Sequence, residues 1–274
     1  MEKPNYNKNI KELKLSIQVR LDGLSFLILD ARSREVVWYE KTSFQGEFTP
    51  PKVLQKLEDH FQKEAELKSD FTEVVLLFSN DLYSLVPEDF FIEEEASNFL
   101  KFNTRILKTD VLAHDHIAGH KMVNVYIPYT NITNYIFDKF GEFEFKHSIS
   151  VFIEAVLNFD SGENTIAYLH AFSNYYHLVI VKEGKLLYSN SFIFETREDF
   201  IYYLLFSFEQ LKMDPLKVPL KISGEINSES ENYKIVYNYI KNVEFLLPEI
   251  DLSSEDYNTP EFKREAFILL KSLI

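Results

Sequence analysis

The sequence lacks cysteine altogether and contains very little glycine. Its 274 residues include no Cys, seven Gly and a single Trp. Without Cys there is no disulfide, no thiolate metal site, no iron–sulfur cluster and no cysteine nucleophile. The absence of cysteine is compatible with a reducing compartment.

The glycines are too dispersed for the common phosphate-binding loops. No two of them are closer than 21 residues in the sequence. Such loops need several neighbouring glycines, because the backbone must approach phosphate closely or turn tightly. The G-x-G-x-x-G motif, the Walker A loop and the G-x-S-x-G turn are therefore absent.

Positive charge is also scarce. Lys and Arg number 29 against 43 Asp and Glu, which gives a net charge of −14, and no run of Lys or Arg stands out. Nucleic acids and anionic membranes attract clustered positive charge, so we expect no nucleic-acid partner. The N-terminus lacks the apolar core of a signal peptide, and the longest stretch without charge, 164–181, contains polar residues. We expect a cytoplasmic protein with no membrane insertion.

Apolar side chains, by contrast, are plentiful. They make up 46% of the chain, and the aromatics include 25 Phe and 16 Tyr. This composition is typical of a globular protein with a sizeable core, and the length suggests about two domains or one large one.

The first half of the chain predicts three strands followed by a helix. Residues 15–22 alternate between apolar and polar and predict a half-buried strand. Asp22-Gly23 predicts a type I′ hairpin turn, and Ser25–Leu29 a strand buried on both faces. Thr49 suits the N-cap of a helix. The further predicted elements are a strand at 35–40, a helix from 50 to about 66, a strand at 73–78, a helix opened by Pro87 over about 88–101, and strands at 108–113 and 121–127.

The second half repeats this order of elements. Glu183-Gly184 predicts a second tight hairpin turn, and Thr196 with Asp199 predicts a capped helix start. The predicted elements are strands at 165–172, 175–181 and 185–194, a helix after Thr196, a strand at 217–222, a helix at 229–240, a strand at 243–247 and a helix at 260–272.

The repeat predicts two lobes. The first spans 1–159 and includes an insertion around 108–147, and the second spans 160–274. Helix 148–159 would join them, with the loop 160–163 as the boundary. Each half has the order of a βββαβαβα unit, so the chain is an α/β protein.

Two βββαβαβα lobes resemble the actin-like ATPase fold, in which each lobe is built on a mixed five-stranded sheet. The residues themselves resemble a bacterial family of unknown function with this duplicated, ribonuclease H-like fold. The segments that carry the resemblance are Leu15–Leu29, Asn124–Asp138 and Phe143–Ser150.

The resemblance implies a nucleotide cleft between the lobes, which is degenerate here. Active members carry a turn that reads roughly Asp-x-Gly-Thr in each lobe and paired glycines that hold adenosine. The corresponding residues of this chain are Asp22, Gly23 and Ser25 in the first turn, Ser173 and Asn174 in the second, and Gly224 at the adenosine segment. The first turn is compressed, the second lacks both Asp and Gly, and the third element has one glycine.

A histidine cluster is the second candidate site. His114, His116 and His120 could bind a metal ion with help from Asp110 and Asp115. The alternative, which we favour, is a polar loop with surface histidines, because no single backbone conformation suits both spacings.

For several other histidines and tyrosines the sequence favours a structural role over a functional one. His147, His170 and His177 stand in or beside predicted strands, where a satisfied core or surface role is more frequent than catalysis. Tyr233 and Tyr237 could form a partner-binding helix face, but core packing is the favoured interpretation.

The sequence as a whole favours a non-catalytic, pseudo-ATPase scaffold that binds a protein partner and uses no cofactor. The alternative is a nucleotide-binding switch or weak ATPase that holds Mg-ATP between the turns, with Asp81 positioning water. The cleft distinguishes the two: if Phe172 and Tyr175 fill the phosphate position the alternative fails, and an open polar cleft supports it.

Overall fold

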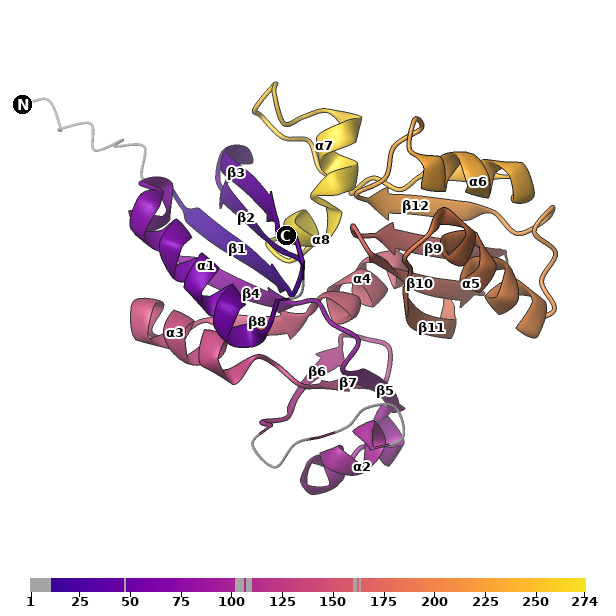
Figure 1. The fold of residues 1–274 in the computed structure, drawn as a ribbon, viewed down its shortest axis with the longest axis horizontal. Helices are drawn as coiled ribbons and strands as arrows, with labels where there is room; N and C mark the ends of the chain where they lie inside the picture. The colour runs from indigo at the N-terminus through magenta and orange to yellow at the C-terminus, as the bar shows by residue number, and fades with distance from the viewer. Residues whose placement is uncertain (1–10, 47, 102–105, 107–109, 160–161, 163) are drawn as a thin grey trace, which may run out of the picture.

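Two five-stranded sheets with equivalent strand orders form the frame of the molecule (Figure 1). The computed structural model describes residues 11–46, 48–101, 106, 110–159, 162 and 164–274. In each sheet, three antiparallel strands are followed by two that join in parallel. The first sheet has the order β3-β2-β1-β4-β8, from β1 (Leu13–Arg20), β2 (Gly23–Asp30), β3 (Glu35–Ser43), β4 (Glu73–Phe78) and β8 (Glu144–His147).

The second sheet repeats this arrangement. Its order is β11-β10-β9-β12-β13, from β9 (Thr165–Ala171), β10 (Tyr175–Lys182), β11 (Lys185–Ile193), β12 (Leu220–Gly224) and β13 (Val243–Phe245). We call the first sheet with its covering helices the first lobe, and the second sheet with its own the second lobe. The predicted α/β class with mixed five-stranded sheets is confirmed.

Each sheet has helices on its outer face, and two further helices lie between the sheets. Outside the first sheet are α1 (Pro50–Lys63) and α3 (Thr130–Phe140), and outside the second are α5 (Arg197–Gln210) and α6 (Glu231–Tyr239). Between the sheets lie α4 (Ser148–Leu157) and α8 (Phe267–Lys271), which follows α7 (Pro260–Glu265).

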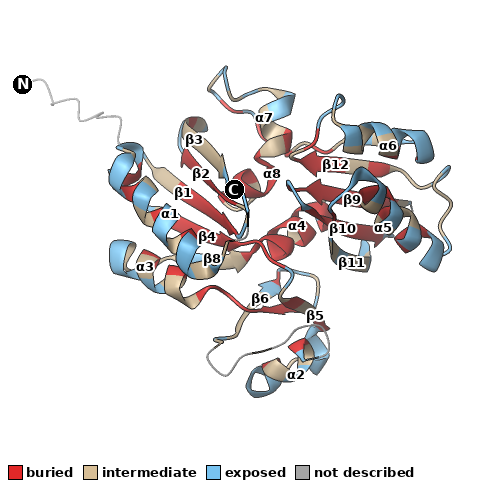
Figure 2. Ribbon diagram, viewed as in Figure 1, coloured by how far each residue is buried: buried red, intermediate tan, exposed pale blue. Residues whose placement is uncertain are grey.

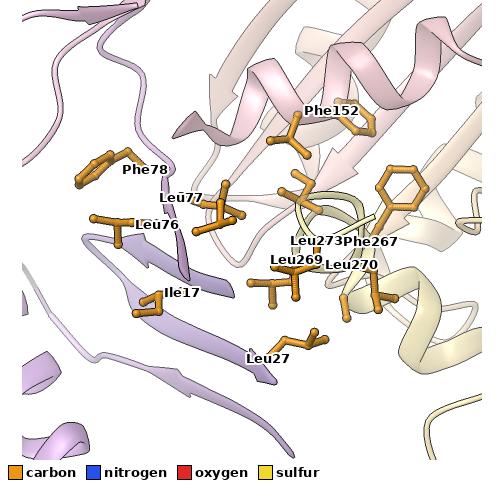
Figure 3. Packing of buried hydrophobic residues seen from close by; sticks show 14 of the residues in the cluster. Ile17, Leu27, Leu76, Leu77, Phe78, Phe152, Phe267, Leu269, Leu270 and Leu273 are labelled. Atoms are coloured by element: carbon orange, nitrogen blue, oxygen red, sulfur yellow. The ribbon is translucent and has the colours of Figure 1, made fainter. Parts of the chain in front are cut away.

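The helices between the sheets are apolar around most of their surface. Nine of the ten residues of α4 are buried, whereas α1 buries a single stripe of Val53, Leu57 and Phe61 (Figure 2). The rings of Phe152 in α4 and Phe267 in α8 meet with centroids 6.0 Å apart (Figure 3). A helix that is apolar on all sides is stable when it is buried on all sides. By packing between the two sheets, α4 and α8 connect the cores of the two lobes.

A small three-stranded sheet is inserted into the first lobe. Its order is β5-β7-β6, from β5 (Tyr83–Pro87), β6 (Ala113–Ile117) and β7 (Met122–Tyr126), and the short helix α2 (Ala96–Leu100) covers it. Residues 160, 161 and 163 of the predicted boundary loop, and 108–109 of a predicted strand, lie outside the described part of the chain. The division at residue 160 stays a prediction.

The predicted helix over 88–101 is wrong. Pro87 is the last residue of β5, an edge strand, where a missing backbone N–H costs little. The 3₁₀ turns Glu88–Phe90 and Glu93–Glu95 follow, and only 96–100 is α-helical.

The prediction of a half-buried β1 is also wrong, because both faces of this strand are buried. Its polar residues Ser16, Gln18 and Arg20 are 0%, 5% and 2% exposed. The C-terminal helix α8 packs against β1, and Ser16 Oγ lies 2.8 Å from Ser272 Oγ just beyond that helix. This contact joins residues from opposite ends of the chain.

Candidate functional site

The two hairpin turns singled out in the sequence touch each other across the lobes. The first joins β1 to β2 through Leu21 and Asp22, and the second joins β9 to β10. Ser173 Oγ donates a hydrogen bond to Asp22 Oδ2. Asp22 and Ser173 are therefore paired with each other, in the place where the resemblance implies nucleotide phosphates.

The predicted type I′ turn at Asp22-Gly23 is wrong in position and in type, because Leu21 and Asp22 form the turn and neither has a positive φ. Gly23 pairs with Arg20 as the first residue of β2, and neither Asp22 nor Gly23 is among the described residues with positive φ. Glycine is needed at 23 for space, since a Cβ there would lie 2.5 Å from the carbonyl oxygen of Thr42.

Arg20 extends the contact between the lobes into a buried ion-pair network. Its Nε lies 2.8 Å from Asp22 Oδ1, and its Nη1 lies 2.5 Å from Glu225 Oε1 at the end of β12. Lys41 reaches Glu225 at 3.6 Å and Glu265 at 2.7 Å. Burial disfavours the charged guanidinium, but the carboxylates of Glu225 and Asp22 outweigh it and raise the pKa of Arg20.

Aromatic side chains occupy the base of the second turn. Phe172 and Tyr175 are 2% and 8% exposed, and their rings stack with centroids 4.3 Å apart. The guanidinium of Arg20 lies 5.1 Å from the centre of the Phe172 ring. The first lobe thus places its buried cation on an aromatic face of the second.

Gly224 and Ser25 have positions fixed by packing. Gly224 has a φ of +89°, and a Cβ there would lie 2.1 Å from the carbonyl oxygen of Ala171 in the neighbouring strand. Only glycine permits this close approach. Ser25 is 3% exposed within β2, between Gln18 and Lys41 of the adjacent strands.

A cavity of about 600 Å³ lies beside the turns and is lined by both lobes. Of the predicted cleft residues, Asp22 and Asn174 line it, together with Asp81, whereas Gly23, Ser25, Ser173 and Gly224 do not. Tyr175 forms part of its wall. The cleft therefore has a closed part, where the turns meet, and an open part beside them.

The predicted histidine loop is wrong, because Ala113–Ile117 is strand β6. His114 and His116 share one strand face, with ring centroids 5.5 Å apart, and His120 lies in the following turn. In the part of the chain that the structure describes, no group of three or more His, Asp or Glu side chains is placed to hold a metal ion.

Asp115 points away from these histidines into the protein. It accepts hydrogen bonds from Ser150 Oγ at 2.5 Å, from the backbone N–H of His147 at 2.8 Å and from the Tyr126 hydroxyl at 3.0 Å. Burial raises the pKa of Asp115 to about 6, although these hydrogen bonds act in the opposite direction. Asp115 fastens the inserted sheet to the start of α4.

Three further histidines, His147, His170 and His177, form a buried set between the lobes. His177 lies 3.0 Å from Ser148 Oγ and 2.6 Å from Ser191 Oγ, and His170 lies 2.8 Å from Ser223 Oγ. Burial lowers the pKa of His147 and of His170 to about 3 and that of His177 well below its ordinary value. These are neutral, hydrogen-bonded core histidines, as the sequence indicates.

Sequence reasoning missed Arg20 and Glu225. The alternation of apolar and polar residues in 15–22 predicted that Arg20 faces solvent. Its partner Glu225 is 205 residues away in the sequence. The one available signal was the acid directly after Gly224, in a segment where the resemblance implies glycine.

Comparison with known proteins identifies the fold and the family of the chain. No curated protein matches the chain. A Bacteroides thetaiotaomicron protein with actin-like ATPase fold and unknown function is 19% identical, with a TM-score of 0.73 over 87% of this chain and 92% of that chain. A chain of the PilM-PilN type IV pilus biogenesis complex is 12% identical, with a TM-score of 0.59 over 94% of this chain and 96% of that chain.

These likenesses confirm the actin-like ATPase fold. Residues 2–243 match the family described as "Protein of unknown function (DUF3822)". The resemblance drawn from the sequence, to a family of unknown function with this fold, is thereby confirmed. The chain belongs to the DUF3822 family and has the actin-like ATPase fold.

Proposed function

We propose that this protein is a non-catalytic member of the actin-like fold, a pseudo-ATPase scaffold that binds a protein partner. The observation that carries the proposal is the direct contact between the two turns. Asp22 bonds Ser173 on one oxygen and Arg20 on the other. A phosphate group at this point would have to displace both partners.

Charge at the closed part of the cleft argues in the same direction. Arg20 is the cation between the turns, and Asp22 and Glu225 already neutralise it. The triphosphate of Mg-ATP keeps a net negative charge and would meet two carboxylates there, and the turns, which contain few glycines, offer few backbone N–H groups to compensate. Tyr175 and Phe172, stacked beneath the second turn, add apolar surface where a phosphate needs donors.

Exposed aromatic side chains on the second lobe support a protein partner. Tyr202 and Phe206 are 59% and 43% exposed on α5, and their rings stack with centroids 5.9 Å apart. Tyr237 on the neighbouring helix α6 is 63% exposed. Aromatic residues at a surface are enriched in protein interfaces. The similar fold in the PilM-PilN complex also belongs to an assembly of two proteins.

The second candidate is a nucleotide-binding switch, and the open part of the cleft favours it. Asp22, Asp81 and Asn174, three residues that this alternative requires, line one cavity. Asp81 would position water, and Asp22 would have to release Arg20 for a magnesium ion.

A thermal-unfolding scan with and without millimolar Mg-ATP and Mg-ADP separates the two candidates. A ligand at about 100 times its Kd stabilises the folded state by about 2.7 kcal/mol, which raises Tm by about 5 to 10 °C in a chain of this size. The scaffold predicts no shift. A dose-dependent shift that is lost in Asp22→Ala and Ser173→Ala would establish the switch instead.

Site-specific photo-crosslinking in the native host tests the partner. A photoreactive residue in place of Tyr202 should give a discrete crosslinked product, and the same residue at exposed Glu183, in the β10–β11 turn, should not. Equal labelling at both positions, or none at Tyr202 and Tyr237, would count against a partner on this face.

A further inference from the structure

Strand β11 is an open edge of the second sheet (Figure 1). Strand β10 pairs with one side of it, and among the described residues no strand pairs with the other side. An unpaired edge presents a row of backbone N–H and C=O groups that can pair with another chain. The outer side of β11 is therefore a template on which an additional strand can form.

The hydrogen bonds of the ladder show which backbone groups point outward. The N–H of Phe194 donates to the carbonyl of Asn174 in the β9–β10 turn. Because the direction alternates along an antiparallel strand, Asn190 also faces β10, whereas Ser191 and Ile193 face away from it. The N–H of Ser191 donates to the side chain of Asn190 at 2.9 Å, which agrees with its having no partner in the ladder.

The equivalent edge of the first lobe, β3, is already covered by a later part of the chain. The N–H of Ser253 donates to the carbonyl of Arg34 at 3.0 Å, and Ser254 Oγ bonds both the N–H and the carbonyl of Val36. No segment within the described ranges takes this place beside β11. The first lobe thus shows that an extended segment can occupy this edge of the repeated fold.

Most of β11 also lacks the features that usually prevent edge strands from pairing. Such edges are protected by charged side chains, by proline or by bulges. In β11 the charge of Lys185 and a bulge that leaves Leu187 unpaired are confined to the start of the strand. The remaining residues, 188–193, include no charged residue and no proline, whereas β3 carries Glu40 and Lys41 in the equivalent stretch.

Stacked aromatic side chains connect this edge to the exposed aromatic face of α5. The ring of Phe192 in β11 stacks on that of Tyr203 with centroids 5.3 Å apart. Tyr203 contacts Tyr202 at 5.4 Å, and Tyr202 stacks on Phe206. Every second side chain of an added strand would lie on the same face of the sheet as Phe192. The open edge and the aromatic face of α5 therefore form one continuous surface.

We propose that β11 binds an extended segment of a partner protein, which adds a sixth strand to the second sheet. The backbone of residues 188–193 supplies the hydrogen bonds. The bound segment is uncharged and carries aromatic or β-branched residues at alternate positions, which pack beside Phe192 and the aromatic residues of α5. This inference rests on the proposed scaffold function and names how the partner binds.

Selected peptides provide the probe. A phage-displayed library of random peptides of about twelve residues is selected on the full chain, and the affinity of enriched peptides is measured by fluorescence anisotropy. Ile193→Pro removes an outward N–H, which an edge strand tolerates, and should weaken binding at least about tenfold without lowering Tm. Ser43→Pro is the matched control and should leave the affinity unchanged, because Ser43 has the equivalent position in β3.

Two further measurements identify backbone pairing. Exchange of the Ser189 and Ile193 amide protons with solvent should slow when the peptide binds. Methylation of alternate peptide amides should abolish binding for one alternate set and not for the other, because only one edge of the added strand faces β11. A failure to enrich any peptide, or equal affinity for the unsubstituted chain and Ile193→Pro, would overturn the proposal.

The same substitution separates this inference from the proposed function. In the native host, the photo-crosslink from position 202 should disappear in Ile193→Pro and persist in Ser43→Pro. A crosslink that persists in Ile193→Pro would contradict strand addition and leave the scaffold function standing, whereas no crosslink in the otherwise unsubstituted chain would count against both. A dimer in sedimentation equilibrium that Ile193→Pro dissociates would show that a second copy of this chain, and not a partner protein, occupies β11.

Discussion

The two lobes share one strand order, but the central strand of the first ends in charged residues and that of the second leads into aromatic residues. In the first lobe β1 ends in Arg20, and the next turn carries Asp22. In the second lobe β9 leads into Phe172, which stacks on Tyr175. The repeated fold therefore presents two unlike turns, and their difference makes them complementary: a cation meets an aromatic face, and a carboxylate meets a hydroxyl. The two turns, which occupy equivalent positions in the repeat, therefore contact each other across the lobes. Substitutions in each lobe separately test this contact.

Lowering the pH should have the largest effect, through His147 of β8 in the first lobe and His170 and His177 in the second. The folded-state pKa of His147 and of His170 is about 3, against about 6.5 when unfolded, so their contribution is complete above pH 6.5 and is lost as the pH falls toward 3. His177 shifts in the same direction. Asp115, with its pKa raised to about 6, acts oppositely and stabilises as the pH falls from 6 to 4. The net loss between pH 7 and pH 5 is about 4 kcal/mol.

Urea titrations at several pH values measure this loss. His170→Gln removes one of the three histidines and should reduce the loss by about 2 kcal/mol, a little under half of the net value. A free energy of unfolding that stays constant between pH 7 and pH 5 would show that these histidines are not buried as described.

Removing the cation of the first lobe should have the next largest effect. Arg20→Met leaves Asp22 and Glu225, whose side chains are 17% and 14% exposed, without their partner. Uncompensated carboxylates at this depth should lower the free energy of unfolding by about 3 kcal/mol, measured by urea denaturation. Arg32→Met is the matched control, since that side chain is 62% exposed and pairs with Glu12 at the surface, so the loss should stay below about 1 kcal/mol. Equal losses in both variants would contradict the buried network.

Gly224 tests the close approach of β12 to β9 in the second lobe. Gly224→Ala combines a positive φ with a Cβ that meets the backbone of Ala171, and we expect a loss of about 2–3 kcal/mol. Gly119→Ala has a similar φ of +75° but open space around the Cβ, so it should cost about 1 kcal/mol. Thermal unfolding of the two variants gives the difference. A greater loss at Gly119 than at Gly224 would contradict this packing.

The smallest effect distinguishes the equivalent helices α1 and α5. Thr196 caps α5 in a complete capping box with Asp199, whereas Thr49 at the start of α1 makes no side-chain cap hydrogen bond. Thr196→Ala should therefore cost about 1 kcal/mol and Thr49→Ala close to nothing, as measured by urea denaturation. Equal costs would show that the two helix starts are alike after all.

Local features of the sequence predicted much of the fold. The alternation and apolar runs located the strands of both large sheets except β8, the Thr196 box located α5, and Glu183-Gly184 has positive φ at both residues as a type I′ turn requires. These signals act over a few residues, so they survive without knowledge of tertiary contacts. The prediction for the inserted region was wrong, because Pro87 is compatible with the start of a helix as well as with the end of an edge strand.

The site was less predictable than the fold. Asp22 and Ser173 could be singled out by the resemblance, but their contact with each other depends on how the lobes close. Arg20 and Glu225 meet only because β1 and β12 end at the same place in space. A pair separated by 205 residues leaves no periodic trace in a single sequence.

No described helix is long and apolar enough to span a membrane.

Because the chain contains no cysteine, an introduced cysteine can be labelled at one chosen position. Gln55→Cys on α1 and Glu209→Cys on α5 place one unique exposed label on each lobe. The central claim is that the lobes are held together by their own turns without a nucleotide. Pulsed electron–electron double resonance between the two spin labels should give one narrow distance distribution that millimolar Mg-ATP leaves unchanged. A distribution that shifts or narrows when Mg-ATP is added would show that nucleotide closes the lobes, and would contradict the account.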